Sequence, residues 1–400
     1  MSASPAQPVA SRRLRIAVLN RIFDPAGGGA ERYSIALVEQ LALRHEIHVF
    51  AQQIRHHAPG VTYHPIAMPL RKPRWLNQLW YATATWWATR RGFDIVHSHE
   101  NTWHGQVQTV HVLPVKYNLF HGRTGLRRLL AWAKVWSSPR LLSYLGLERL
   151  RFSARSGRRV VVTSASLGET LASTYPGTAA ETRVITPGAM LPEALTTEAE
   201  KRAARQQLSL PPEGLCLLLV GNDYRKKGLG TLLRVLRDLP ADVVLAVVGN
   251  PGQIPVFERQ AQADGVAGRV FFLGSLQDVA PAYRAADCLV HPTLEDTFAM
   301  VVLEAMAHGL PVVVSSAVYC GISGLLSHGV NALILEDPRN AQQLGQILNQ
   351  LLGDAVLRQQ LGEQARAFAS QYQWQDIARQ QEEVYFSVLR SNTVRLNRSP

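Results

Sequence analysis

The sequence predicts an α/β protein with two doubly wound domains in tandem, each a parallel sheet covered by helices on both faces. Three observations lead to this prediction. The chain has 400 residues, enough for two domains of ordinary size, and 46% of them are hydrophobic, as in globular proteins. Short apolar runs alternate with segments of helical periodicity in both halves. The stretch 189–212, rich in Ala, Glu, Thr and Pro, separates the two series and is interpreted as a linker with a short helix.

The first series opens with a βαβ unit, in which a glycine-rich turn at 25–29 joins a strand to a helix. The patterns place strands at 15–20, 46–51, 93–97, 108–110, 159–164 and 183–186 and a helix at 31–43. In the second series they place strands at 215–221, 243–249, 270–273, 288–291 and 311–315 and helices at 229–239, 257–264, 279–285 and 298–308. A last strong helix is expected at 374–389.

The chain is accordingly divided into six parts: a disordered tail 1–13, an N-terminal domain 14–188, the linker 189–212, a C-terminal domain 213–371, a final helix 372–390 and a tail 391–400. No apolar run reaches the roughly 18 residues that a membrane span needs. The first residues lack the apolar stretch and cleavage site of a secretory signal. The three cysteines form no CxxC pair, so we expect reduced thiols in a cytoplasmic protein.

The net charge of +12 is unevenly distributed along the chain. Residues 1–187 contain 24 Lys and Arg against 9 Asp and Glu, a net +15, whereas the remainder contains 18 against 21, a net −3. Such an excess suits an anionic membrane surface, a phosphorylated acceptor or nucleic acid, although a solvated basic surface explains it too.

Seven of the eight tryptophans lie between Trp75 and Trp136, interleaved with arginines in 71–91 and 123–140. This pattern favours either a peripheral contact with the inner face of the cytoplasmic membrane or a site for a phosphorylated, lipid-linked glycan. Tryptophan in the core with arginine on the surface is the simpler alternative.

Two turns lie where ligands of open parallel sheets bind, beyond the carboxyl ends of strands and next to helix N-termini. The glycines at 27–29 let backbone N–H groups approach an anion closely. The run Arg225-Lys226-Lys227-Gly228 precedes a helix, where cations are unfavourable unless an anion such as a diphosphate is present. Taken singly, each is equally well explained as a tight turn or a solvated basic turn. No GxGxxG or GxxxxGK[ST] motif is present, which argues against a dehydrogenase or a P-loop protein.

The segment from His291 to Met300 leads from a buried strand into a helix that contains Glu304. Asp296 lies at the start of the helix. Glu304 is expected about 9 Å further along the helix axis, at a rise of roughly 1.5 Å per residue. Carboxylates so placed can hold sugar hydroxyls at one end of a nucleotide sugar and ribose hydroxyls further along. They are too far apart for the acid/base pair of a retaining glycosidase. An N-capping Asp and a helix-surface Glu are the simpler alternative.

Histidines are frequent after a strand of the first domain, at positions 97, 99, 104 and 111. Their spacing matches no zinc signature, and no metal site is expected. His111 ends a short β-type run, 108–110, where a strand would reach the cleft, so it is a candidate hydrogen-bonding group, although a lone histidine is more often structural.

In combination these segments resemble the retaining glycosyltransferases of family 4, which have the GT-B fold. The resemblance covers most of the chain and is strongest in PAGGGAER, LLLVGNDYRKKG and ADCLVHPTLEDTFAMVVLEAMAHGLPVVVS. Within the family the chain is most similar to the lipopolysaccharide core glucosyltransferases, through VGNDYRKKG and HPTLEDTFAMVVLEA. The resemblance implies two Rossmann-like domains facing a cleft that holds the donor, with the final helix crossing back onto the N-terminal domain.

The resemblance also implies roles for individual residues. Asp296 and Glu304 fall on the two acids of the family's E-x7-E motif, which contact the transferred sugar and the ribose. Lys227 falls on the phosphate-binding lysine, with Arg225 or Lys226 as a second cation. The catalytic candidates are thus Asp296, Lys227 and His111, and the donor-binding candidates are Gly28, Gly29, Arg225, Lys226, Phe298, Ala299, Met300 and Glu304.

Three positions depart from the family pattern. Asn222 replaces the usual Arg after the strand Gly, Asp296 replaces Glu, and Thr297-Phe298-Ala299 replaces Gly-Phe-Gly. These departures leave the donor sugar undetermined.

The implied reaction is transfer of a hexose from a nucleotide sugar, most simply a UDP-sugar, to a glycan or lipid-linked acceptor. No metal and no other cofactor is implied, and the setting is assembly of lipopolysaccharide core or another cell-surface polysaccharide. A nucleotide-sugar epimerase of the same fold is an alternative. A basic nucleic-acid-binding protein is another, although the sequence contains no recognised nucleic-acid module.

Overall fold

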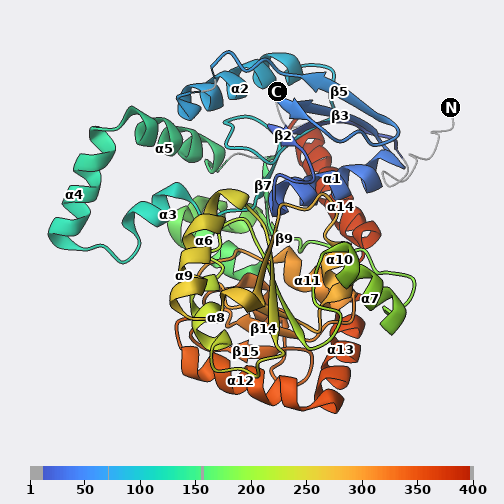
Figure 1. Ribbon diagram of the computed structural model, residues 1–400. Coiled ribbons are helices and arrows are strands. Elements are labelled where there is room, and N and C mark those ends of the chain that lie inside the picture. The colour runs from blue at the N-terminus through green and yellow to red at the C-terminus, as the bar shows by residue number, and fades with distance from the viewer. Residues whose placement is uncertain (1–11, 71, 155–156, 397–400) are drawn as a thin grey trace. The chain divides into compact units, whose positions relative to one another are not determined.

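The computed structural model describes residues 12–70, 72–154 and 157–396, so nearly all of the predicted N-terminal tail lies outside the described residues (Figure 1). The chain forms two compact units. Unit 1 consists of the chain up to Thr186 together with the segment that starts at Trp374, and unit 2 consists of Pro187–Gln373. Each unit is built around a parallel sheet, as the alternation of strands and helices predicts.

The main sheet of unit 1 has seven strands in the order β5-β3-β1-β6-β7-β8-β9, all paired in parallel. Its strands are β1 Arg15–Leu19, β3 Glu46–Ala51, β5 Val61–Pro65, β6 Ile95–Ser98, β7 Val107–Val110, β8 Arg159–Val162 and β9 Thr182–Val184. A small second sheet pairs β2 (Ile22–Phe23) with β4 (Gln53–Ile54). The strand order reverses between β1 and β6, which is the switch point of a doubly wound sheet.

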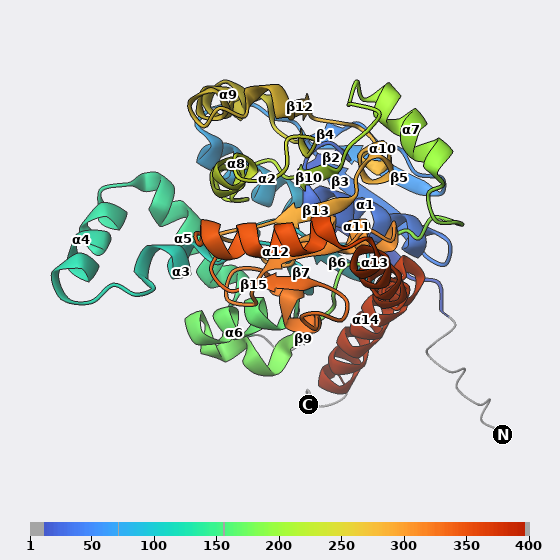
Figure 2. The ribbon, with the colours of Figure 1, turned by 60° about the horizontal axis from the view of Figure 1, so that its bottom comes forward.

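The helices of unit 1 before residue 186 are α1 Gly29–Ala42, α2 Arg74–Thr89, α3 Val115–Phe120, α4 Gly125–Trp136, α5 Pro139–Arg151 and α6 Ala165–Thr174. The sequence patterns did not predict α2 to α6. In α2 the reason is that its inner face buries polar residues such as Asn77, Gln78 and Thr85. No continuous apolar stripe therefore marks this helix in the sequence. Helices α3, α4 and α5 form an arm that projects from the unit (Figures 1 and 2).

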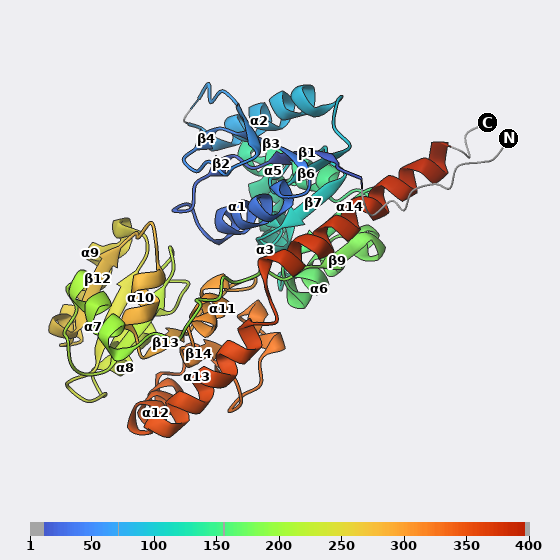
Figure 3. The ribbon, with the colours of Figure 1, turned by 90° about the vertical axis from the view of Figure 1, so that its right-hand side faces the viewer.

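The final helix, α14 (Trp374–Leu396), belongs to unit 1 and packs against α1 (Figure 3). Its Tyr385 hydroxyl is 2.7 Å from Nδ1 of His97 on β6. The predicted return of this helix to the N-terminal domain is therefore confirmed. The predicted end at residue 390 is wrong, because the helix continues to Leu396 and so includes part of the expected tail.

The sheet of unit 2 has six parallel strands in the order β12-β11-β10-β13-β14-β15. Its strands are β10 Cys216–Val220, β11 Val244–Val248, β12 Val270–Gly274, β13 Cys288–His291, β14 Val312–Ser315 and β15 Leu333–Leu335. The side chains of β10 alternate between two cores, with Leu218 in one and Leu217 and Leu219 in the other. Both faces of the sheet are therefore buried, as parallel strands require.

The helices of unit 2 are α7 Glu198–Gln207, α8 Leu229–Leu236, α9 Ile254–Ala263, α10 Ala280–Ala285, α11 Met300–Ala307, α12 Ala341–Gly353 and α13 Ala355–Ala369 (Figure 2). The predicted linker 189–212 contains α7, which packs on α10. Ala204 and Leu210 of this stretch are buried in the core, so the stretch is an integral part of unit 2 rather than a free connection. Among the residues that the structure describes, no helix has the length and apolar character needed to span a membrane.

Candidate functional site

The basic turn after β10 is shaped by two glycines. Gly228 has a left-handed φ of 76°, and a Cβ there would lie 1.9 Å from the carbonyl oxygen of Pro292. A Cβ on Gly221 would lie 2.6 Å from Cγ of Lys227. Only glycine therefore lets the turn approach β13 this closely and lets the Lys227 side chain lie across the end of β10. The two strand ends are further joined by the Leu294 N–H, which donates to the Lys226 carbonyl at 2.7 Å.

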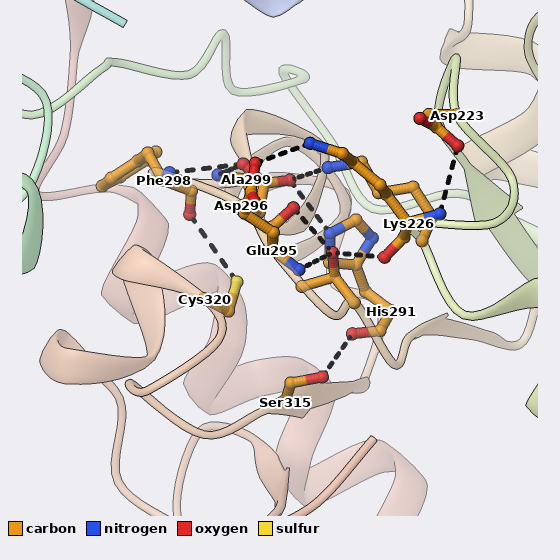
Figure 4. A network of polar contacts seen from close by, with 11 residues as sticks. Asp223, Lys226, His291, Glu295, Asp296, Phe298, Ala299, Ser315 and Cys320 are labelled. Atoms are coloured by element: carbon orange, nitrogen blue, oxygen red, sulfur yellow. Dashed lines mark hydrogen bonds and ion pairs between the residues drawn. The ribbon is translucent and has the colours of Figure 1, made fainter. Parts of the chain in front are cut away.

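Four donors converge on the Asp296 carboxylate: two from the turn between β13 and α11, one from the end of β13 and one from the turn after β10 (Figure 4). Oδ1 accepts the N–H of Ala299 at 2.8 Å and that of Phe298 at 3.3 Å. Oδ2 lies 2.5 Å from Nζ of Lys227 and 3.2 Å from Nε2 of His291. Asp296 thus occupies the helix mouth as an anion, which is the position where a helix N-terminus binds negative charge.

The electrostatics of this turn favour a charged carboxylate. Burial alone would raise the pKa of Asp296, but the Lys227 ammonium and the His291 hydrogen bond outweigh it and hold that pKa below the ordinary value. Burial also lowers the pKa of His291, whose side chain is fully inaccessible, so its ring is neutral at pH 7. Because a carboxylate only accepts hydrogen bonds, the ring proton is on Nε2 and points at Asp296.

The backbone around Asp296 is held by the loop after β14. The Asp296 N–H donates to the Tyr319 carbonyl at 2.8 Å, and the Gly321 N–H donates to the Asp296 carbonyl at 3.0 Å. Ala299 adopts a left-handed conformation with φ 72° at the start of α11. The family has glycine at this position by resemblance, and glycine adopts that conformation at lower cost.

The other predicted residues of unit 2 lie around this turn. Glu304 on α11 accepts a hydrogen bond from the Tyr283 hydroxyl at 2.7 Å. Lys226 is exposed and pairs with Glu295 at 2.7 Å, and Arg225 is exposed. Met300 is the first residue of α11. The N–H groups of Phe298 and Ala299, which the resemblance directs to a diphosphate, donate to Asp296 here.

The predicted residues of unit 1 lie at the start of α1 and the end of β7. Gly28 precedes α1 with a φ of 156°, and Gly29 is its first residue. One turn later, the Tyr33 ring contacts that of His111 edge-on, with centroids 4.9 Å apart. Nε2 of His111 is 2.9 Å from Nδ1 of His99. Burial and the nearby Arg151 cation lower the pKa of His111 to about 3, so this ring is neutral at pH 7.

Sequence reasoning missed the partners that fix the acids. The sequence patterns place His291 at the end of a strand and predict no role for Tyr283 or Glu295. The signal for His291 was present, because a polar residue at the carboxyl end of an otherwise apolar strand is where ligand-binding groups gather. Among the described residues, no group of three or more His, Cys, Asp or Glu is arranged to hold a metal ion.

Two units, each built on a parallel sheet, are what the GT-B fold requires, and comparison with known proteins shows that fold. A model of group 1 glycosyl transferases matches residues 200–368, and a model of glycosyltransferase family 4 matches residues 27–190. The fold resembles the crystal structure of WaaG, a glycosyltransferase of lipopolysaccharide biosynthesis, with a TM-score of 0.80, 21% identity and coverage of 92% of this chain and 99% of that one. It also resembles HepE of Anabaena in complex with UDP and glucose, with a TM-score of 0.71, 20% identity and coverage of 94% and 100%.

The chain therefore belongs to the glycosyltransferases of the GT-B type. It is 31% identical over 169 residues to the lipopolysaccharide glucosyltransferase WaaG of Escherichia coli, which covers 41% of this chain and 44% of that protein. It is 30% identical over 230 residues to a D-inositol 3-phosphate glycosyltransferase of Corynebacterium urealyticum, covering 54% and 53%. The chain thus spans about half the length of the first curated relatives that it matches.

Proposed function

We propose that the protein transfers a hexose from a nucleotide sugar, most simply a UDP-sugar, to a glycan or lipid-linked acceptor with retention of configuration. One observation carries the proposal: the Lys227 ammonium, the His291 ring and the start of α11 converge on one ionised carboxylate at the carboxyl edge of a parallel sheet. A group of fixed donors and one fixed acceptor suits a ligand that has both phosphates and hydroxyls.

Lys227 and Asp296 have complementary roles in this reaction. As the C1–O bond to the diphosphate stretches, positive charge grows on the sugar and negative charge on the leaving phosphate. An ammonium has three N–H donors, so Lys227 can keep its contact with Asp296 and still donate to a phosphate oxygen. The ionised Asp296 accepts hydrogen bonds from sugar hydroxyls, and Arg225 or Lys226 adds a second cation for the leaving group.

The remaining roles follow the family resemblance. Glu304 would accept the ribose hydroxyls, and the glycines at 28 and 29 would admit the donor close to the backbone of unit 1. His111 would offer a neutral hydrogen-bonding group to the transferred sugar. The cations supply the charge stabilisation that a metal supplies elsewhere, so we expect turnover to survive treatment with a chelator.

The names of the relatives support a surface glycan as acceptor. The Escherichia coli relative is a lipopolysaccharide glucosyltransferase, and a solved structure of similar fold is a lipopolysaccharide outer core galactosyltransferase. We place this chain in lipopolysaccharide core or related polysaccharide assembly, at the inner face of the cytoplasmic membrane, where a lipid-linked acceptor would be available.

The test is a screen of nucleotide sugars for binding and slow hydrolysis, with the Asp296→Ala, Glu304→Ala and Lys227→Ala variants alongside. We expect a UDP-sugar to raise the melting temperature of the wild type and each variant to weaken that effect. Failure of every nucleotide sugar to bind would contradict the proposal. Epimerised donor formed without acceptor would favour the epimerase, and salt-sensitive oligonucleotide binding without donor binding would favour the nucleic-acid protein.

A further inference from the structure

His291 is the last residue of β13, and its side chain is fully inaccessible to solvent. The three residues before it, Cys288, Leu289 and Val290, are buried and apolar. Because side chains alternate along a strand, the His291 ring lies on the same side of the sheet as Leu289, whose core cluster includes residues of α11. An apolar side chain would suit this position, so the presence of an imidazole ring needs another explanation.

The hydrogen bonds of this ring are incomplete. Nε2 lies 3.2 Å from Oδ2 of Asp296, and Figure 4 shows the ring directed at that carboxylate. Among the residues that the structure describes, none forms a hydrogen bond with Nδ1 of His291, although this atom is buried. A buried nitrogen without a partner lowers stability. Packing and stability therefore do not account for this histidine, whereas its contact with Asp296 does.

The donors that surround Asp296 differ in how firmly they are held. Nζ of Lys227 is at the end of a flexible four-carbon side chain, and in the proposed reaction it also donates to the leaving phosphate. The Ala299 N–H is part of the backbone and holds Oδ1 at 2.8 Å. The His291 ring is rigid, extends from an interior strand of the sheet and holds Oδ2. One rigid donor on each oxygen fixes the plane of the carboxylate, also when Lys227 turns to a phosphate.

We propose that His291 is a positioning residue for Asp296. Its Nε2–H group holds the carboxylate in the plane in which the acid accepts hydroxyl groups of the transferred sugar. The inference rests on the proposed function, because it requires a sugar beside Asp296. In this role His291 contacts no reacting atom, so what matters is an N–H group at the position of Nε2. A substitute that supplies that group should support the reaction, and one that lacks it should not.

Three substitutions of His291 test this role through the slow hydrolysis of the UDP-sugar that stabilises the wild type. In His291→Gln the amide nitrogen reaches the place of Nε2, in His291→Asn it reaches only the place of Nδ1, and His291→Leu has no donor. We expect kcat to fall roughly tenfold to hundredfold for His291→Leu and His291→Asn, and to stay near the wild-type value for His291→Gln. The rise in melting temperature with UDP alone should be equal in all of them, because UDP carries no sugar for Asp296 to bind.

Melting temperatures without ligand separate positioning from core packing. A buried amide costs stability that a leucine does not, so His291→Leu should be the most stable of the three variants although it is among the least active. The matched control is Cys288→Ala, at a fully buried position on the same strand. It leaves a small cavity, so it should lower the melting temperature and leave kcat unchanged. If kcat instead follows the melting temperature through all four variants, the role of His291 is structural and the proposal is wrong.

The proton of the His291 ring gives a readout that needs no nucleotide sugar. In protein with ¹⁵N-labelled histidine, the signal that His291→Gln removes is that of His291, and we expect a neutral ring with its proton on Nε2. Asp296→Asn should shift this signal. A proton on Nδ1, or equal kcat for His291→Gln and His291→Leu, would overturn the proposal. If the wild type binds no nucleotide sugar, the proposed function fails and this role with it, whatever the ring signal, whereas a His291→Leu variant that hydrolyses the donor as fast as the wild type refutes only the positioning role.

Discussion

The polar groups at the strand ends differ between the two units: they are charged in unit 2 and neutral in unit 1. In unit 2, Lys227 and Asp296 form a charged pair, and the pKa of the acid is held below its ordinary value. In unit 1, His97, His99 and His111 form a neutral group, because burial, and then their neighbouring cations and rings, lowers their pKa values, to about 3 for His97 and His111. The first group stabilises charge, whereas the second offers uncharged hydrogen-bonding atoms.

This difference suggests a division of labour under the proposed function. The leaving diphosphate needs cations and helix-terminal N–H groups, which unit 2 supplies. Sugar hydroxyls need donors and acceptors that do not compete for the phosphate, and a neutral His111 meets that need. The low pKa of His111 keeps this ring uncharged at pH 7, so it would not compete with the unit 2 cations for the phosphate.

Removal of the unit 2 cation should have the largest effect. Lys227→Ala is expected to lower turnover of the nucleotide sugar roughly 10²- to 10³-fold, as when one preorganised charge-stabilising group is removed. The variant also leaves the Asp296 carboxylate without its strongest charge partner, so the pKa of that acid should rise. Arg237→Ala is the control, since Arg237 pairs with Asp238 on the surface of the same unit. Similar losses in both variants would mean that the charged pair has no special role.

A substitution that disturbs the packing of the basic turn should have the next largest effect, on the free energy of unfolding. Gly228→Ala forces a left-handed Ala, at about 1 to 2 kcal/mol, and adds a clash with the Pro292 carbonyl, for a total loss of about 3 kcal/mol. Gly265→Ala is a matched control, because Gly265 has a φ of 72° but no heavy atom within 4 Å of the added Cβ. Denaturant unfolding followed by far-ultraviolet circular dichroism measures the difference. Equal losses would show that the approach of the two turns contributes nothing to stability.

The arrangement of strands was predictable because buried parallel strands are continuous apolar runs bounded by turns. The strand Cys288–His291 was predicted with the bounds that the structure gives it. Helix α2 escaped prediction because its inner face is polar. Apolar periodicity marks a helix by its apolar stripe, and it fails where the inner face of a helix buries polar groups.

The candidate site was predictable as a set of strand ends but not as a network. Lys227 and Asp296 are 69 positions apart in the chain, and their contact depends on the approach of Gly228 to Pro292. Asp296 replaces the Glu of the family pattern, and an Asp side chain is one methylene shorter. That the carboxylate turns back onto the N–H groups of Phe298 and Ala299 depends on the left-handed Ala299, which no spacing rule reveals.

Acid should destabilise the two groups in different pH ranges. A histidine whose pKa is lower in the folded chain stabilises the fold above its unfolded pKa of about 6.5, and this contribution is lost as the pH falls toward about 3 for His97. Since His97 is fully buried, we expect His97→Gln to reduce the slope of unfolding free energy against pH by up to about 1.4 kcal/mol per unit between about pH 6 and 4.

Tryptophan fluorescence measures this slope in unit 1 alone, because all eight tryptophans lie in segments of that unit. His57→Gln is the control, since His57 is exposed. The contribution of Asp296 has the same sign but a lower range: it is complete above its ordinary pKa of 3.8 and is lost only as the pH falls below that value. A wild-type slope that His97→Gln leaves unchanged would contradict the contrast between the neutral and charged groups.

The smallest expected effect concerns the exposed pair Lys226–Glu295, whose side chains are about half exposed. Glu295→Gln should change the free energy of unfolding by less than about 1 kcal/mol, because water screens a surface ion pair. If Lys226 is the second phosphate cation, Lys226→Ala should raise the donor KM several-fold with little change in stability, whereas Arg225→Ala should leave KM unchanged. The reverse outcome assigns the role to Arg225. Comparison of the two KM values therefore decides whether Lys226 or Arg225 is the second phosphate-binding cation of unit 2. Neither outcome changes the neutral histidine group of unit 1.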